Sequence, residues 1–166
     1  MSYITIRRAT EDDIATIRDL AWCIFPHTYR EILTPEQNDY MMEWMYSESS
    51  LRDQMAHGHQ YLLAYDGSTA VGYVSVEQQD EHLFHLQKIY VLPERQGEGL
   101  GKKLFEAAIR LIKSQHPGPC AMELNVNRNN RAVTFYERMG MHKDRSGDFD
   151  IGHGFYMNDY IMRMEL

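Results

Sequence analysis

The sequence has little cysteine and no long apolar run. Cys23 and Cys120 are the two cysteines in 166 residues, so one disulfide at most could form, and a chain of this size does not depend on one. No apolar stretch approaches the roughly 18 residues that cross a bilayer, and the first residues lack the apolar block of a signal peptide. We therefore expect a cytoplasmic protein with two free thiols and no membrane partner.

Positive charge is also scarce. The chain has 17 lysines and arginines against 24 acidic residues, which gives a net charge of −7. Proteins that bind nucleic acid rely on clustered basic residues, so we expect no nucleic-acid partner. The eight histidines form two close pairs, His57 with His59 and His82 with His85, and neither pair has the spacing of a zinc site. We therefore expect no metal.

Periodicity and turn signals predict one α/β domain over residues 1–166. Expected strands cover 3–7, 60–66, 69–77, 83–91, 120–126 and 155–165, with a further short strand at 141–144. Expected helices cover 14 to Pro26, 35–46, 51–57, 100–114 and 132–139. This order predicts a mixed sheet of about six to seven strands, antiparallel in its first half and parallel where helices intervene, with helices on both faces.

A glycine-rich loop joins a predicted strand to an amphipathic helix at Gln96-Gly97-Glu98-Gly99-Leu100-Gly101-Lys102. Glycines allow close approach of the backbone to an anion, and the helix N-terminus favours a phosphate there. The loop does not match a P-loop, because Lys103 stands where serine or threonine is required. It does not match the dinucleotide fingerprint either, because its glycines follow the pattern G-x-G-x-G.

Two motifs resemble those of the GNAT superfamily of acyl-CoA-dependent N-acetyltransferases. Gln96-x-x-Gly99-x-Gly101, preceded by Val91-x-Pro93, is similar to that family's pyrophosphate-binding loop. The segment 129–141 is similar to its second signature, N-x-x-A-x-x-F-Y-x-x-x-G-F, with Met141 in place of the usual aromatic residue. The order of strands follows the family as well, so the resemblance covers essentially the whole chain and implies the GNAT fold.

The resemblance implies acetyl-CoA as co-substrate and assigns a role to each matching residue. In the family the strand before the loop pairs with the pantetheine arm, and a β-bulge there directs an N–H group at the thioester carbonyl. The implied donor-binding residues are Ile89, Tyr90, Val91, Gln96, Gly97, Glu98, Gly99, Leu100, Gly101, Lys102, Asn129 and Tyr136, with Arg95, Lys102 and Lys103 as charge partners for the pyrophosphate.

Two of these assignments have structural alternatives. Tyr136 would protonate the leaving thiolate as general acid, but it also lies on the apolar face of its helix, where a tyrosine can simply pack. Asn129 would hydrogen-bond the pantetheine, but it could also cap the helix that follows.

The incoming amine must lose a proton before it attacks, so a base or a water path to one is expected. His85 falls where some family members place a base carboxylate, and an imidazole has a suitable unperturbed pKa. An ordinary strand histidine is the alternative. Glu123, on the neighbouring strand, is the second candidate and Glu77 the third.

The acceptor region, between the first helix and the hairpin, is rich in aromatic residues and methionine. Most of these side chains are expected to pack in the core: Trp22, Phe25, Tyr29, Tyr40, Met41, Met42, Trp44, Met45 and Tyr46. The segment 25–29 is expected to be a loop, and carboxylates lie nearby at Glu31, Glu36, Asp39 and Glu43. Carboxylates and aromatic faces together favour a cationic amine.

We therefore expect acetyl transfer from acetyl-CoA to a primary amine by direct attack in a ternary complex, with a small cationic amine favoured. The terminal stretch and general layout are similar to bacterial polyamine acetyltransferases. The alternatives are an enzyme that acetylates peptide N-termini or lysines, and an acyl-CoA-binding sensor without catalysis. Many members of the family dimerise, so the resemblance also allows a homodimer.

Overall fold

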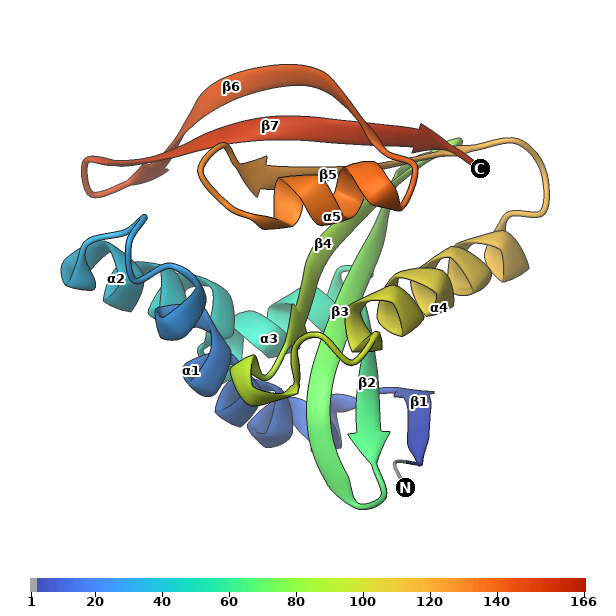
Figure 1. The fold of residues 1–166 in the computed structure, drawn as a ribbon, viewed down its shortest axis with the longest axis horizontal. Coiled ribbons are helices and arrows are strands. Elements are labelled where there is room, and N and C mark those ends of the chain that lie inside the picture. Colours follow the sequence, from blue (N-terminus) through green and yellow to red (C-terminus); the bar gives the residue numbers. More distant parts are fainter. Residues whose placement is uncertain (1–2) are drawn as a thin grey trace.

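The computed structural model describes residues 3–166 as a seven-stranded sheet in the order β1-β2-β3-β4-β5-β7-β6, with helices packed on it. The strands are β1 Ile4–Arg8, β2 Gln60–Asp66, β3 Thr69–Asp80, β4 Leu83–Val91, β5 Ala121–Asn127, β6 His142–Gly152 and β7 Phe155–Glu165. The helices are α1 Ile14–Thr28, α2 Pro35–Tyr46, α3 Glu48–Ala56, α4 Leu100–Gln115 and α5 Ala132–Arg138. The expected mixed α/β sheet of six to seven strands is confirmed (Figure 1).

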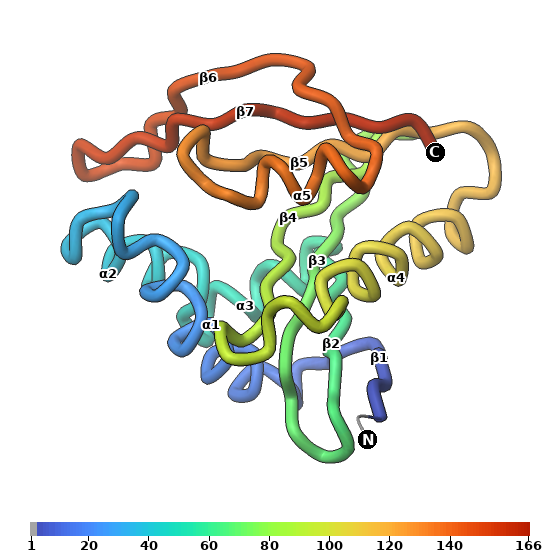
Figure 2. Tube along the Cα trace, in the orientation of Figure 1, coloured from blue at the N-terminus to red at the C-terminus, as the bar shows by residue number. Residues whose placement is uncertain are grey.

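Helices cover both faces of the sheet, as expected (Figure 2). One core, which includes Phe25 and Tyr73, lies between the sheet and helices α1, α2 and α3. The other core, which includes Leu104 and Leu124, lies between the sheet and helices α4 and α5. The alternation of side chains along β5 therefore has a physical role, since Met122, Leu124 and Val126 enter the second core while Glu123 and Asn125 face the other side.

Helix α1 runs two residues past Pro26, so the prediction that this proline ends the helix is wrong. A proline removes one N–H donor and disfavours the turn before it, but the later bonds of the last turn still form. The Tyr29 amide donates to the Phe25 carbonyl at 3.1 Å. Residues 27–28 are therefore helical rather than in a loop, and Tyr29 takes a fixed position at the helix end.

Strand β6 has the weakest strand signal in the sequence. It covers His142–Gly152 rather than 141–144 and carries mostly exposed polar and charged side chains, so no apolar alternation reveals it. β6 pairs with β7, while β7 pairs with β5, and all these pairings are antiparallel. The expected parallel pairing across an intervening helix holds for β4 with β5 alone among the strands described.

Cys23 is exposed and Cys120 is buried, and both are free thiols. No helix within residues 3–166 has the length and apolarity to cross a membrane. The cytoplasmic location and the domain extent of 1–166 stay predictions, and Met1 and Ser2 lie outside the described residues.

Candidate active site

The two parallel strands at the centre of the sheet separate after a short stretch of pairing. β4 and β5 pair from Leu83 with Ala121 to His85 with Glu123. Directly after this stretch β4 contains a bulge, because Leu86 pairs with Val76 and Lys88 pairs with Ser75, which leaves Gln87 between them. The strands then diverge around a cleft of about 590 Å³, called the central cleft below, which is lined by residues 86–91 of β4 and 124–126 of β5.

The separation leaves one edge of β4 without a strand partner. Ile89, Tyr90 and Val91 all line the central cleft, as expected for residues that pair with an inserted extended group. Their other edge is held by β3, since Val74 pairs with Ile89 and Gly72 with Val91. The bulge precedes Ile89 by two residues and increases the local twist of the strand. The backbone here is thus rigid on one side and open for hydrogen bonding on the other.

The glycine loop forms the other end of the central cleft. Gly97 and Gly99 have φ of 85° and 82°, a left-handed conformation that favours glycine. An added Cβ at either position would meet open space, so backbone conformation rather than crowding explains these glycines. Gly99 provides no side-chain cap for α4, and the first N–H groups of a 16-residue helix are available to an anion.

The predicted loop residues divide by position. Gln96, Leu100 and Gly101 line the central cleft, while Gly97, Glu98, Gly99 and Lys102 belong to the same loop but not to the lining. Arg95 is engaged by two carboxylates, Asp66 at 2.8 Å and Glu98 at 3.0 Å. Its charge is therefore compensated within the chain, and Lys102 and Lys103 stay as the exposed cations of the loop.

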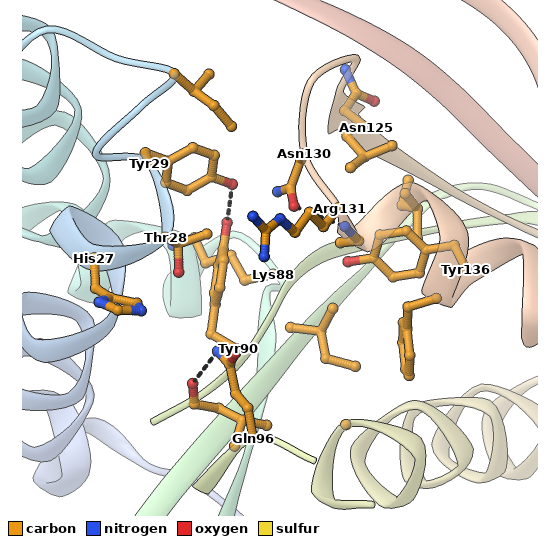
Figure 3. A pocket seen from close by; sticks show the side chains of 18 of the residues that line it. His27, Thr28, Tyr29, Lys88, Tyr90, Gln96, Asn125, Asn130, Arg131 and Tyr136 are labelled. Atoms are coloured by element: carbon orange, nitrogen blue, oxygen red, sulfur yellow. Dashed lines mark hydrogen bonds between the residues drawn. The ribbon is translucent and has the colours of Figure 1, made fainter. Parts of the chain in front are cut away.

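Helix α5 brings Tyr136 and the asparagines before it to the cleft. Tyr136 is 7% exposed, and its hydroxyl points into the central cleft (Figure 3). Burial raises the pKa of this phenol well above its usual value, so it is protonated at neutral pH. Packing and function are therefore compatible, because the ring contributes to the core while the hydroxyl faces the cleft.

Asn129 also lines the central cleft. The turn at the start of α5 is instead stabilised by Asn130, whose Oδ1 accepts a hydrogen bond from the Ala132 amide at 2.9 Å. From the sequence, Asn129 could have been the residue that caps this helix. In the structure Asn130, the next residue, makes the corresponding contact. The role of Asn129 toward the donor stays a prediction.

The three candidate bases do not line the central cleft. His85 lies behind Asn125, with its Nε2 3.0 Å from Asn125 Oδ1, and burial lowers its pKa. Glu123 forms ion pairs with Arg145 and Arg163, each at 2.9 Å, and the hydrogen bond from Arg145 is the main reason that its pKa is lowered.

Glu77, the third candidate, accepts a hydrogen bond from Gln87 at 2.9 Å and lies 3.2 Å from His59. Each of the three candidates thus has its side chain engaged by a neighbour.

Sequence reasoning missed two features of the lining. The hydroxyls of Tyr29 and Tyr90 lie 2.9 Å apart and join the end of α1 to β4 (Figure 3). Lys88 is 7% exposed. Among the residues that the structure describes, its ammonium contacts uncharged groups alone: Gln54 Oε1 at 2.9 Å, Tyr61 Oη at 2.5 Å and the Tyr46 ring at 4.3 Å. Burial lowers the pKa of Lys88 to about 7.

The acceptor side of the cleft is bounded by residues 27–32. Outside the lining, α2 contacts the end of the β6–β7 hairpin. Tyr40 of α2 donates a hydrogen bond to the Ile151 carbonyl at 2.5 Å. Its ring also packs against His153 and Phe155, with centroids 4.7 and 5.5 Å apart. The hairpin and α2 are thereby joined at this end of the molecule. Within residues 3–166 no group of three or more histidine, cysteine and acidic side chains could hold a metal.

Solved structures with the same fold come from several acetyltransferases. The PaiA N-acetyltransferase from Thermoplasma acidophilum, in complex with coenzyme A, is 24% identical, with 99% of each chain covered and a TM-score of 0.81. A GCN5-related N-acetyltransferase from Rhodopseudomonas palustris is 19% identical over 100% of this chain and 98% of that one, with a TM-score of 0.83. The ribosomal-protein-S18-alanine N-acetyltransferase from Escherichia coli is 16% identical over 98% and 94%, with a TM-score of 0.73.

At these identities the likeness concerns the fold, and the family follows from the sequence itself. The family model described as the acetyltransferase (GNAT) domain matches residues 30–163, which include both motifs and all of the cleft lining except residues 27–29. The open edge of β4, the uncapped start of α4 and the left-handed glycines are chemically suited to coenzyme A. The chain belongs to the GNAT family and is an acetyl-CoA-dependent N-acetyltransferase.

Proposed function

We propose that the protein transfers the acetyl group of acetyl-CoA to the primary amine of a small cationic acceptor by direct attack in a ternary complex. The observation that carries this proposal is the continuity of the central cleft. A single cavity of about 590 Å³ reaches from Gln96 and Gly101 at the loop to Glu31 and Asn125 at the other end. Donor and acceptor can therefore meet in one space without a covalent enzyme intermediate.

Each end of the cleft has chemistry that suits one substrate. The backbone edge of residues 89–91 would hold the pantetheine arm, and the N–H groups from Gly97 to Lys102 would hold the pyrophosphate. The buried and protonated Tyr136 is suited to donate its proton to the departing thiolate as the C–S bond breaks. These roles follow from the motif positions, and of the residues concerned 89–91, Leu100, Gly101 and Tyr136 line the cleft.

The contact between α2 and the β6–β7 hairpin favours a small amine over an internal lysine of a protein. Tyr40 joins the two elements through Ile151 and Phe155, and this contact would restrict the path of an extended peptide on that side. Acetylation of a chain end stays a second candidate, because a terminus could enter from one side, and the similar Escherichia coli enzyme carries ribosomal-protein alanine acetylation in its name. Arg30 and Arg131 also line the cleft, so an acceptor that carries a carboxylate besides its amine is the competing class of small amine, and the panel below includes amino acids for that reason.

The test is release of free thiol from acetyl-CoA with a panel of polyamines, amino acids, aminoglycosides and short peptides. We expect turnover with at least one small amine and little with peptides whose single amine is an internal lysine. Tyr136→Phe should lower kcat by about 10²-fold or more while leaving the Kd for coenzyme A within twofold. Tyr156→Phe, an exposed tyrosine outside the cleft, is the control. Tight binding of coenzyme A without turnover on any amine would instead identify a sensor.

A further inference from the structure

His82 and His116 form a pair of imidazoles at the surface, and neither residue lines the central cleft. His82 directly precedes β4, and His116 is the first residue after α4. The His82 Nδ1 and His116 Nε2 atoms lie 3.1 Å apart, and the two rings are nearly perpendicular, at 86°. The two histidines are 34 positions apart in the chain. Histidine spacing in the sequence therefore does not reveal the pair.

The hydrogen bonds of His116 determine which of its nitrogens can bind a ligand. Its Nδ1 lies 3.1 Å from the Gly118 carbonyl oxygen. A carbonyl oxygen only accepts, so Nδ1 carries the proton and Nε2 has a lone pair. The Phe84 ring packs against the His116 ring, with centroids 6.2 Å apart. Metal-binding histidines usually donate their second N–H group to a carbonyl or a carboxylate, which orients the ring. His116 already makes this contact.

His82 has a comparable partner at its second nitrogen. Its Nε2 lies 3.8 Å from Glu81 Oε1. In the pair as it stands, His82 Nδ1 donates its proton to His116 Nε2. If a metal ion takes the lone pair of Nδ1, the imidazole proton lies on Nε2 and faces the Glu81 carboxylate. The His82 side chain is 65% exposed, so its ring can turn toward an ion without disturbing the core.

The spacing of the two nitrogens suits a single metal ion. Two Zn–N bonds of about 2.0–2.1 Å at the tetrahedral angle place their nitrogens about 3.3 Å apart, close to the 3.1 Å between His82 and His116. Imidazole suits zinc, copper and nickel among the transition metals. Within residues 3–166 no third histidine, cysteine or acidic side chain completes a larger group, so water would fill the other positions of the ion.

The pair also joins two elements that meet at the central cleft. Residues 86–91 of β4 line the cleft, and so does Leu100, the first residue of α4. His82 and His116 lie at the opposite end of each element, and the His82 carbonyl accepts a hydrogen bond from the Ala121 amide of β5 at 2.9 Å. An ion bound by both imidazoles would connect the end of α4 to the sheet. It would therefore stabilise the native protein relative to the unfolded chain.

We propose that His82 and His116 bind a divalent transition-metal ion of the class of Zn²⁺, Ni²⁺ and Cu²⁺. The ion takes the lone pairs of His82 Nδ1 and His116 Nε2 and replaces the proton that the two nitrogens share. The site lies outside the central cleft, so it supports the fold and takes no part in acetyl transfer. It is independent of the acceptor and of the function proposed above.

The experiment measures the Kd of Zn²⁺ by calorimetry in the wild type, His82→Gln, His116→Gln and His57→Gln. His57 is the matched control, because it also follows a helix and its Nδ1 also lies near a backbone carbonyl, that of Asp53 at 2.7 Å. Loss of an outer-shell partner alone costs about 10–100-fold in metal affinity. We therefore expect each substitution within the pair to weaken binding at least about tenfold, and His57→Gln to change it less than about twofold.

Thermal unfolding with and without Zn²⁺ gives a second measurement. Zn²⁺ should raise the melting temperature of the wild type and of His57→Gln, and excess chelator should reverse the rise, while His116→Gln should not respond. A wild type that does not bind Zn²⁺, or an unchanged affinity in either variant of the pair, would overturn the proposal. Equal losses in His57→Gln and His116→Gln would show adventitious binding to surface histidines and would overturn it as well.

Discussion

The hydroxyls of Tyr29 and Tyr90 lie 2.9 Å apart and connect the end of α1 to β4 at the wall of the central cleft. The Phe25 ring packs against both residues, with centroids 4.4 Å from Tyr29 and 6.4 Å from Tyr90. Burial raises the pKa of both phenols, so both are protonated and one can donate to the other. This contact holds the acceptor wall against the strand that is proposed to bind the donor.

A double-mutant cycle should measure this contact. Tyr29→Phe and Tyr90→Phe each remove one hydroxyl and leave the ring packing intact. We expect a coupling free energy of about 0.5–1.5 kcal/mol between the two changes, which is typical of a hydrogen bond. Urea unfolding of the wild type, both single variants and the double variant gives this value. A coupling near zero would show that the two hydroxyls do not interact in solution.

The glycine loop can be tested by a pair of substitutions with the same backbone cost. Gly99 and Gly58 both have positive φ, and an added Cβ would meet open space at both. An aspartate at either position should therefore destabilise the fold by a similar amount, about 1 kcal/mol. Gly99→Asp also places a carboxylate at the start of α4, so it should weaken coenzyme A binding at least about a hundredfold, while Gly58→Asp should not.

Fluorescence or calorimetric titration with coenzyme A, alongside urea unfolding, separates the two effects. Equal affinities in the two variants would contradict the assignment of the loop to the pyrophosphate.

The sequence predicts the elements whose signals are local. Strand β4 and helix α2 have the bounds that their turn and capping residues predict, and the hairpin turns at Gly67 as expected. The edge strand β6 has no such signal, because an exposed strand needs no apolar alternation and its pairing with β7 depends on distant contacts. Pro26 misleads because a proline in a last helical turn removes one bond rather than the helix.

The same distinction applies to the site. Loop and helix motifs predict Gln96, Gly101, Asn129 and Tyr136, and all four line the central cleft. Nothing in the sequence distinguishes Lys88 from other lysines in strands, because its burial comes from contacts with Tyr46 of α2 and Gln54 of α3. Residues whose properties come from packing therefore require the structure.

Lys88 should make stability depend on pH. Burial lowers the native pKa of Lys88 to about 7, below the ordinary lysine value of 10.5. Between these two pH values the unfolded chain therefore binds a proton that the native protein has released. Stability should therefore rise with pH across this window. Lys88→Met removes the titration and leaves Tyr61 bonded to Gln54 at 2.6 Å.

The measurement for Lys88 is urea unfolding of the wild type and Lys88→Met at pH 7 and pH 9.5. We expect the wild type to gain about 2–3 kcal/mol relative to the variant between these two conditions, from about 1.4 kcal/mol per pH unit. The comparison cancels the contribution of the other titrating groups. The same change with pH in both proteins would contradict an unusual native pKa for Lys88.

Glu123 should contribute to the stability of the fold rather than to proton transfer. Its carboxylate is fixed between Arg145 and Arg163, and its side chain is 5% exposed. Glu123→Gln keeps the volume but removes the charge that both guanidinium groups contact, so we expect a loss of about 1–2 kcal/mol in unfolding free energy.

The contribution of Glu123 to the free energy of unfolding should decrease as the pH falls. The native pKa of Glu123 is lowered, so its contribution is complete above the unfolded value near 4.5 and is lost as the pH falls through the native pKa. The difference in stability between the wild type and Glu123→Gln should therefore be constant from pH 7 to about pH 5.5 and shrink below about pH 4.5.

The kcat of the variant, with the best amine of the panel, should stay within about twofold of the wild type, with an unchanged pH profile, since the residue does not line the cleft. A loss of the rising limb of that profile in Glu123→Gln would instead identify this carboxylate as the base.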